Sequence, residues 1–283
     1  MTTTETSTPV TERVRAGSFE TSVIQGGPID GPKILLLHDG AWGASGPLTW
    51  GGFLPRLTST YRVIVPDLLG YGQADKAVFV DRAQHDFRLD HLSALLEILG
   101  VDEPLHIVGN SFGGAVALRS LARPGLLPTR TVTSIAGSGG PWRTPEAPGI
   151  MASWDGSREG LAIVTGKLID PAFPGFDEHL DARFTSARTA GHYRSVVAPG
   201  APLPAGLETK VDDPWPEQIR GLEVPTLLVR CIHDELLEPE WADHVHAALP
   251  NSRIAEVNAR HSPQIDAPGE LESILLPFLA EFD

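Results

Sequence analysis

The chain contains a single cysteine, Cys231, so no disulfide bond can form within it. Cys231 ends an apolar run, where a free cysteine is usually a buried hydrophobic residue and not a nucleophile. The first residues are polar and rich in threonine, with no apolar segment of the kind that a signal peptide needs. We therefore expect residues 1–15 to form a disordered tail and the protein to be cytoplasmic.

Basic residues are also scarce, because 22 Lys and Arg stand against 36 Asp and Glu, for a net charge of -14. Phosphate contacts need clustered Lys and Arg, and anionic membranes attract basic surfaces. No apolar run approaches the roughly 18 to 20 residues that span a bilayer. We expect neither nucleic acid nor a membrane as a partner. The sequence leaves the oligomeric state open, including a homodimer.

Short apolar runs alternate with helical patterns along most of the chain. The runs at 33–38, 61–67 and 105–108 are continuous, as in strands that are buried on both faces. Alternation of strands and helices predicts a mostly parallel sheet with helices on both faces. Further strands are expected at 19–25, 130–136, 225–231 and 253–257, and helices at 50–57, 87–99, 240–249 and 268–282.

Residues 138–213 break this alternation. The segment is rich in Pro, Gly, Trp and Arg, and it has only weak helical signals, at 160–169 and 180–194. Strands typical of the core resume after it. We therefore predict a helical cap at 138–213, inserted into a core that consists of residues 16–137 and 214–283.

A Gly-Asn-Ser-Phe-Gly string at 109–113 lies between an apolar run and a helical pattern. This strand-turn-helix context is what a nucleophile elbow requires, with Ser111 as the nucleophile. The glycines on either side let the backbone bend sharply. In a chain with 29 glycines such a string also arises by chance. The assignment of Ser111 therefore depends on whether a base and an acid can be found.

A catalytic serine needs a histidine base, and that base needs an acid to orient it. On this architecture the three follow in the order serine, acid, histidine, each after a strand. Asp234 follows the strand at 225–231, and His261 follows the strand at 253–257. The sequence therefore predicts a triad of Ser111, Asp234 and His261, with Glu235 as the alternative acid.

Acyl transfer also needs N–H donors for the oxyanion. The backbone N–H of Phe112 is one candidate, and the loop after the strand at 33–38 supplies the other, with Gly40 preferred over Ala41. His38 fits a structural role at the start of that loop. Asn110 either supports the elbow or lines the pocket. The remaining histidines show no ligand spacing, so we expect no metal.

Six segments match motifs of a known enzyme family: Leu-Leu-Leu-His (35–38), Pro-Asp-Leu-Leu-Gly-Tyr-Gly (66–72), Gly-Asn-Ser-Phe-Gly-Gly (109–114), Val-Pro-Thr-Leu-Leu-Val (224–229), His-Asp-Glu-Leu (233–236) and His-Ser-Pro (261–263). With them the chain resembles enzymes of the α/β-hydrolase fold over nearly all its length past the tail. The resemblance implies a mostly parallel eight-stranded sheet flanked by helices, an inserted helical cap, and a serine hydrolase that uses no cofactor.

Within that family, the segments 109–114 and 43–46 are similar to those of the meta-cleavage-product hydrolases. These enzymes cleave a carbon–carbon bond in 2-hydroxy-6-oxo-dienoates with a Ser-His-Asp apparatus. Asp39 and Trp42 replace a glycine and a proline that those enzymes usually carry, and Ser262 replaces a tryptophan. The resemblance implies a carbon–carbon hydrolase of a small, partly apolar substrate. The alternatives are a carboxylesterase or lactonase of secondary metabolism, and a non-hydrolytic lyase or binding protein on the same fold.

The resemblance also implies a cap arginine that binds a substrate carboxylate, and Arg183 is the candidate. A solvated surface position is the favoured interpretation of Arg183, because cap helices are largely exposed. The other candidate substrate-binding residues are Asn110, Ala41, Trp42 and Trp142.

Overall fold

Eight strands hydrogen-bond into one sheet in the order β1-β2-β4-β3-β5-β6-β7-β8 in the computed structural model, which describes residues 6–198 and 213–283. The strands are β1 (Thr6–Ala16), β2 (Phe19–Pro28), β3 (Lys33–Leu37), β4 (Arg62–Pro66), β5 (Leu105–Asn110), β6 (Thr129–Ile135), β7 (Thr226–Cys231) and β8 (Ser252–Val257). The β1–β2 and β2–β4 pairs are antiparallel, and all later pairs are parallel. The prediction of a mostly parallel eight-stranded sheet is confirmed.

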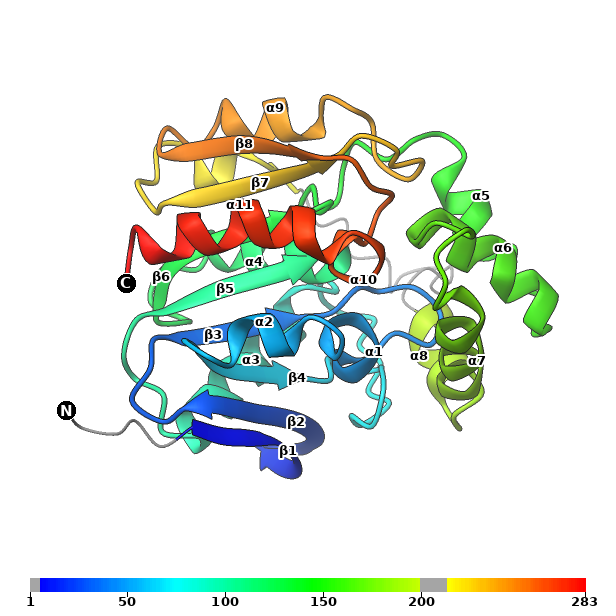
Figure 1. Ribbon diagram of the computed structural model, residues 1–283, viewed down its shortest axis with the longest axis horizontal. Helices are drawn as coiled ribbons and strands as arrows, with labels where there is room; N and C mark the ends of the chain where they lie inside the picture. The colour runs from blue at the N-terminus through cyan, green and yellow to red at the C-terminus, as the bar shows by residue number, and fades with distance from the viewer. Residues whose placement is uncertain (1–5, 199–212) are drawn as a thin grey trace.

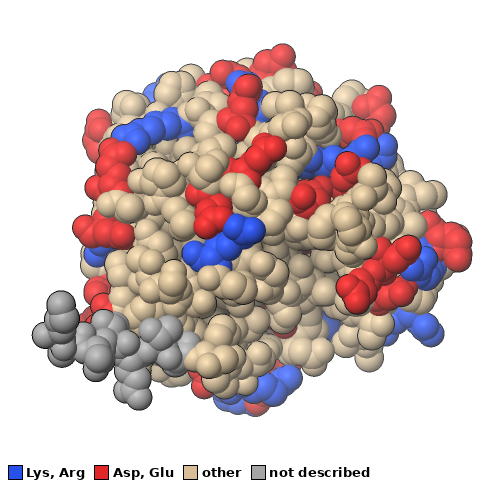
Figure 2. All heavy atoms as spheres, in the orientation of Figure 1, with Lys and Arg blue, Asp and Glu red and all other residues tan. Residues whose placement is uncertain are grey.

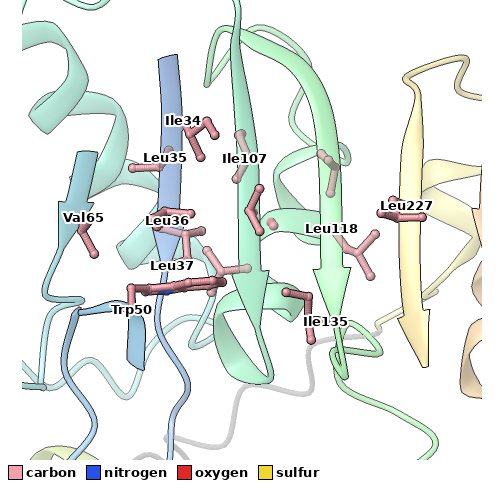
Figure 3. Packing of buried hydrophobic residues seen from close by; sticks show 14 of the residues in the cluster. Ile34, Leu35, Leu36, Leu37, Trp50, Val65, Ile107, Leu118, Ile135 and Leu227 are labelled. Atoms are coloured by element: carbon pink, nitrogen blue, oxygen red, sulfur yellow. The ribbon is translucent and has the colours of Figure 1, made fainter. Parts of the chain in front are cut away.

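The central strands are buried because both faces of the sheet are covered by helices. Every residue of β5 is buried, and apolar side chains of β4, β3, β5, β6 and β7 form a continuous layer (Figure 3). In Figure 1, α2 and α11 lie on the near face of the sheet and α3 and α4 on the far face. The core helices are α1 (Gly46–Trp50), α2 (Leu54–Leu57), α3 (Asp86–Ile98), α4 (Phe112–Ser120), α9 (Trp241–His246), α10 (Pro263–Asp266) and α11 (Pro268–Ala280).

Four helices follow β6 and lie beyond the carboxyl ends of the parallel strands (Figure 1). They are α5 (Ala147–Ala152), α6 (Arg158–Leu168), α7 (Phe176–Ala187) and α8 (His192–Val197), and the name cap refers to these four helices below. Trp154, Leu161, Val164 and Leu180 form a small apolar cluster there, which Trp42 joins from the core. Residues 199–212 of the predicted insertion lie outside the described residues.

The predicted tail is a strand over most of its length. Val14 and Ala16 are buried, whereas Arg13 and Arg15 are exposed and form ion pairs with Glu20 of β2. This alternation has the two-residue period of a strand with one buried face. The prediction of a disordered tail is therefore wrong for residues 6–15, because pairing with β2 gives this polar segment a partner for its backbone. Residues 1–5 lie outside the described residues.

The turn between β5 and α4 places Ser111 in a conformation that few side chains adopt, with φ 55° and ψ -117°. Close backbone contacts surround it. A Cβ added to Gly113 would lie 2.3 Å from the Leu37 carbonyl oxygen, and one added to Gly109 would lie 2.2 Å from the Gly113 carbonyl carbon. Only glycine fits these two positions, which explains the Gly-x-Ser-x-Gly string.

Replacing Gly113 with alanine is expected to destabilise the protein, because the new methyl group would overlap the backbone of β3. Overpacking of this kind costs about 1–3 kcal/mol of unfolding free energy. The matched control is Gly149→Ala in α5, where an added Cβ meets no atom within 4 Å. Urea denaturation should show a loss of stability in G113A and none in G149A. Equal stability of the two variants would contradict the close contact.

Candidate active site

Side chains from three loops meet where the parallel strands end. The Nε2 atom of His261 lies 2.7 Å from the Ser111 Oγ, and its Nδ1 lies 2.8 Å from the Asp234 Oδ2. The other oxygen of Asp234 accepts a hydrogen bond from the Leu236 N–H at 2.8 Å, which orients the carboxylate. Because the carboxylate only accepts, Nδ1 carries the proton, and Nε2 is free to take one from Ser111. The structure thus brings the three predicted residues together in the order that the chemistry needs.

The alternative acid, Glu235, points elsewhere. Its carboxylate is exposed and forms ion pairs with Lys167 and Arg260. The Asp234 side chain, by contrast, is only 6% exposed and contacts His261 directly. The geometry therefore favours Asp234 as the acid.

Asn110 supports the site from beneath and does not line the pocket. Its side-chain amide donates to the His261 carbonyl oxygen at 2.8 Å. Its oxygen accepts hydrogen bonds from Ser262 and Gln264, both at 3.0 Å. Asn110 is fully buried, so contrary to the expectation of substrate contact it ties the elbow to the histidine loop.

The loop after β3 is held by hydrogen bonds that leave the Gly40 N–H free for an oxyanion. The Ala41 N–H donates to the Asp39 Oδ1 at 2.9 Å, and the Tyr71 hydroxyl donates to the Gly40 carbonyl at 3.0 Å. Among the described residues, none accepts a hydrogen bond from the Gly40 N–H. Gly40 and Phe112 both line the pocket beside Ser111. This arrangement favours Gly40 over Ala41 as the loop donor.

His38 has the structural role that its position predicts. Its Nε2 accepts a hydrogen bond from the Leu68 N–H at 2.9 Å, so Nδ1 bears the proton and donates to the Asp39 carbonyl at 2.6 Å. Burial lowers the pKa of the His38 imidazole. A neutral ring that bridges β4 to the oxyanion loop has no free nitrogen for catalysis.

Arg183 is neither exposed nor in the pocket. Its guanidinium is fully buried in α7 and binds both oxygens of Asp39, at 3.1 and 3.0 Å. It also donates to the Trp42 carbonyl at 3.1 Å. The surface position that we favoured is therefore wrong. Arg183 does bind a carboxylate, but this carboxylate belongs to Asp39 and not to a substrate.

The two predicted tryptophans also lie outside the pocket lining. Trp42 is buried against Trp154 and stacks on Tyr193, with its indole N–H bound to the Met151 carbonyl. Trp142 stacks on His244 at 4.8 Å between ring centres. Trp42 thus packs against the helices that follow β6 and Trp142 packs against α9, and contrary to expectation neither residue lines the pocket. Ala41, another candidate for substrate contact, lines the pocket.

The pocket above Ser111 has a volume of about 300 Å³, at the small end of ligand sites. One part of its wall is apolar and comes from the cap and from the loop after β7, and another part is polar. Arg143 is its one cationic residue among those described. The apolar residues include Ala147, Met151, Leu168, Val196, Leu236 and Leu237, and the polar ones are Tyr71, Gln84, Ser138, Arg143 and Ser195.

Sequence reasoning missed Arg143 and Tyr71. Both follow strands of the parallel sheet, Tyr71 after β4 and Arg143 after β6, and that position was the signal available. The backbone around Arg143 is fixed, because the Trp142 carbonyl and the Thr144 N–H pair with the segment after Asp234. Its side chain forms no ion pair with any residue in the described ranges.

Beneath the polar end of the pocket lies a second arginine, Arg88, which is 2% exposed. Its guanidinium packs over the rings of Tyr71 and Phe112. Burial lowers its pKa to about 10, so it stays charged at neutral pH. Burial also lowers the pKa of His85, which stacks on Phe112, to about 3. Of these two side chains, only Arg88 therefore carries a positive charge at neutral pH.

Within residues 6–198 and 213–283, no group of three or more His, Cys, Asp or Glu side chains is arranged to hold a metal ion. No helix there has the length and hydropathy needed to cross a membrane. On the face shown in Figure 2, acidic side chains lie among basic ones.

Asp234→Asn is expected to lower kcat about 10⁴-fold, because an amide no longer selects the correct tautomer of the catalytic histidine. The matched control is Glu235→Gln, which removes the neighbouring charge and should keep wild-type kcat. Steady-state kinetics on one ester substrate checks both variants. A loss in E235Q that matches the loss in D234N would reassign the acid.

Comparisons with known proteins agree with this geometry. The sequence model of the Alpha/beta hydrolase family matches residues 34–274. The chain is 30% identical over 269 residues to a 2-hydroxy-6-oxo-6-(2'-aminophenyl)hexa-2,4-dienoic acid hydrolase from Metapseudomonas resinovorans, covering 94% of this chain and 90% of that protein.

Solved structures share the fold. A 2-hydroxy-6-oxo-6-phenylhexa-2,4-dienoate hydrolase from Rhodococcus sp. strain RHA1 has a TM-score of 0.85 at 22% identity, covering 98% of this chain and 100% of that one. A carboxylesterase from Bacillus subtilis has a TM-score of 0.78 at 19% identity, covering 97% and 92%. The chain belongs to the alpha/beta hydrolase family and is a hydrolase.

Proposed function

We propose that this enzyme cleaves a carbon–carbon bond next to a carbonyl group in a small substrate of the 2-hydroxy-6-oxo-dienoate type, with Ser111 as its nucleophile. The observation that carries the proposal is the hydrogen-bonded chain from Ser111 through His261 to Asp234, which opens into a pocket with one arginine in its wall. The name of the 30% identical relative supports the substrate class.

The chemistry follows from the atoms in place. His261 takes the proton of Ser111 as the serine oxygen bonds to the substrate carbonyl carbon, and Asp234 stabilises the imidazolium. The N–H groups of Gly40 and Phe112 receive the negative charge on the carbonyl oxygen. The carbon–carbon bond then breaks, and its electron pair goes to the leaving fragment, which His261 protonates. For this the dienol must first have become a ketone, so that the leaving carbanion is delocalised.

A second step restores the enzyme. Water loses a proton to His261, attacks the ester on Ser111, and releases a carboxylic acid. No step requires a group beyond the side chains and N–H groups described, and we propose that the enzyme uses no cofactor.

Arg143 is our candidate for binding the substrate carboxylate. It is in the pocket wall, and no described residue forms an ion pair with it, whereas the guanidinium of Arg183 is occupied by Asp39. A charge-assisted hydrogen bond to a carboxylate contributes about 1.5–3 kcal/mol. The positive charge of Arg88, which packs over two rings of the pocket wall, adds to this preference.

The second candidate function is a carboxylesterase or lactonase. The observation that favours it is the Asp39–Arg183 pair, which removes the cap arginine as a carboxylate ligand and leaves a largely apolar wall around Ser111. The same triad and oxyanion donors would serve an ester.

We also propose a cytoplasmic enzyme that takes a free small molecule and no nucleic acid. The net charge of -14 supports this partner choice, because phosphate backbones repel an acidic surface. All three residues of the triad come from one chain, so a monomer and a homodimer would have the same chemistry.

Wild-type enzyme is expected to turn over a 2-hydroxy-6-oxo-6-phenyl-dienoate with higher kcat/KM than p-nitrophenyl butyrate, as followed by the loss of the dienolate absorbance. Ser111→Ala should abolish turnover of both, since it removes the nucleophile. A clear preference for the ester would favour the esterase. Turnover of neither substrate, or full activity in S111A, would refute the serine-hydrolase proposal.

Arg143→Gln is expected to raise KM for the dienoate about 10-fold or more, the equivalent of the lost charge-assisted bond. It should leave KM for the neutral ester unchanged. Arg194→Gln is the matched control, because it removes the same charge from an exposed position of α8 outside the pocket wall. An equal rise of KM for both substrates would mean that Arg143 shapes the pocket and does not bind a carboxylate.

A further inference from the structure

The Asp39–Arg183 pair lies next to the oxyanion loop, but the triad does not use it. Both side chains are fully buried, and they join the loop after β3 to helix α7 of the cap. A buried ion pair is costly unless its geometry is well satisfied. Here the geometry is satisfied on both sides.

The carboxylate of Asp39 is fully used. Its Oδ1 accepts from the Ala41 N–H and from Arg183, and its Oδ2 accepts from the Thr49 hydroxyl at 2.8 Å and from Arg183. The guanidinium forms a planar fork with these two oxygens, a geometry that fixes orientation as well as distance. Arg183 thereby sets the orientation of the carboxylate, which in turn holds the Ala41 N–H.

The peptide groups on both sides of Gly40 are held in this way. The carbonyl before it accepts from His38, the carbonyl of Gly40 itself accepts from Tyr71, and the next N–H donates to Asp39. The Gly40 N–H is thus fixed in direction by its neighbours while it makes no bond within the described residues. A donor of this kind is preorganised for an oxyanion.

Charge gives the pair a second effect. Burial by itself raises the pKa of the Asp39 carboxyl, but the charge and hydrogen bonds of Arg183 outweigh burial and hold this pKa well below its usual range. Asp39 is therefore an anion one residue away from the oxyanion donor. Without Arg183 its charge would repel the developing oxyanion, because charges interact strongly in a buried site.

We infer that Arg183 is a positioning residue for the oxyanion hole, which acts from the cap through Asp39 on the Gly40 N–H. The inference rests on the proposed serine-hydrolase function, and it holds for esters and dienoates alike. It assigns to the cap a part in transition-state stabilisation in addition to forming the pocket. It predicts a loss of kcat with every substrate and little change in KM.

The test compares Arg183→Gln, Arg183→Lys, Asp39→Asn and the double variant R183Q/D39N, with p-nitrophenyl butyrate as the substrate. R183Q is expected to lower kcat about 10- to 100-fold and to leave KM unchanged. This decrease is no larger than the decrease caused by removing one oxyanion donor outright. R183K, which keeps the charge but not the fork, should recover part of kcat. Because the two residues act as a unit, the double variant should be no slower than the slower single variant.

The matched control is Arg158→Gln. Arg158 joins α6 to α7 through ion pairs with Asp177 and Asp181 on the surface of the cap, far from the loop after β3 in sequence. Its loss weakens the cap without touching Asp39, so kcat should stay at the wild-type value. If kcat fell as much in R158Q as in R183Q, the loss would come from a less stable cap, and the inference would be overturned.

A second readout separates positioning from folding. A trifluoromethyl ketone adds to Ser111 and forms a tetrahedral oxyanion, so its inhibition constant should rise in R183Q by the same factor as kcat falls. Circular dichroism gives the folded fraction, and a kcat loss that merely follows it overturns the inference. So does an R183Q variant whose KM rises for the dienoate alone, because Arg183 would then bind substrate. Wild-type enzyme that turns over neither substrate refutes instead the proposed function.

Discussion

The strained turn at Ser111 is the constraint on which the site depends. Its φ of 55° is held from both sides, since the Ser111 N–H donates to the Ile135 carbonyl of β6 and the Ser111 carbonyl accepts from Ala115 in α4. These bonds, and the contact of Gly113 with β3, are possible only where three parallel strands lie side by side. The contacts of the sheet thus offset the energetic cost of the strained backbone, as is usual for strain at functional sites.

The other parts of the site are attached to this turn through buried polar groups. Asn110 links the elbow to the His261 loop, and Asp39 links the oxyanion loop to the cap. A buried hydrogen bond that loses one partner costs more than the bond itself contributes, because the remaining group is left desolvated. Each of these links is therefore specific, and the triad, the oxyanion loop and the cap are fixed relative to one another.

Much of this could be predicted from the sequence, and for identifiable reasons. The strands and the triad order follow from apolar runs and from loops at strand ends, which depend on local pattern alone. The roles of Arg183, Trp42 and Trp142 were missed because they depend on contacts across long sequence separations, 144 residues in the case of Arg183 with Asp39. Strand β1 is difficult to predict for a different reason, since its polar, threonine-rich composition is also typical of a disordered tail.

Asp39 stands where the similar carbon–carbon hydrolases usually carry a glycine, and this difference determines what Arg183 binds. A glycine at this position would leave the Ala41 N–H without its carboxylate and the buried guanidinium of Arg183 without its partner. An uncompensated buried charge is far costlier than a paired one, so that guanidinium would need another anion, and a substrate carboxylate could serve. With Asp39 present the anion is internal. Recognition of a substrate carboxylate therefore has to come from another cation, and Arg143 is the arginine that the pocket wall provides.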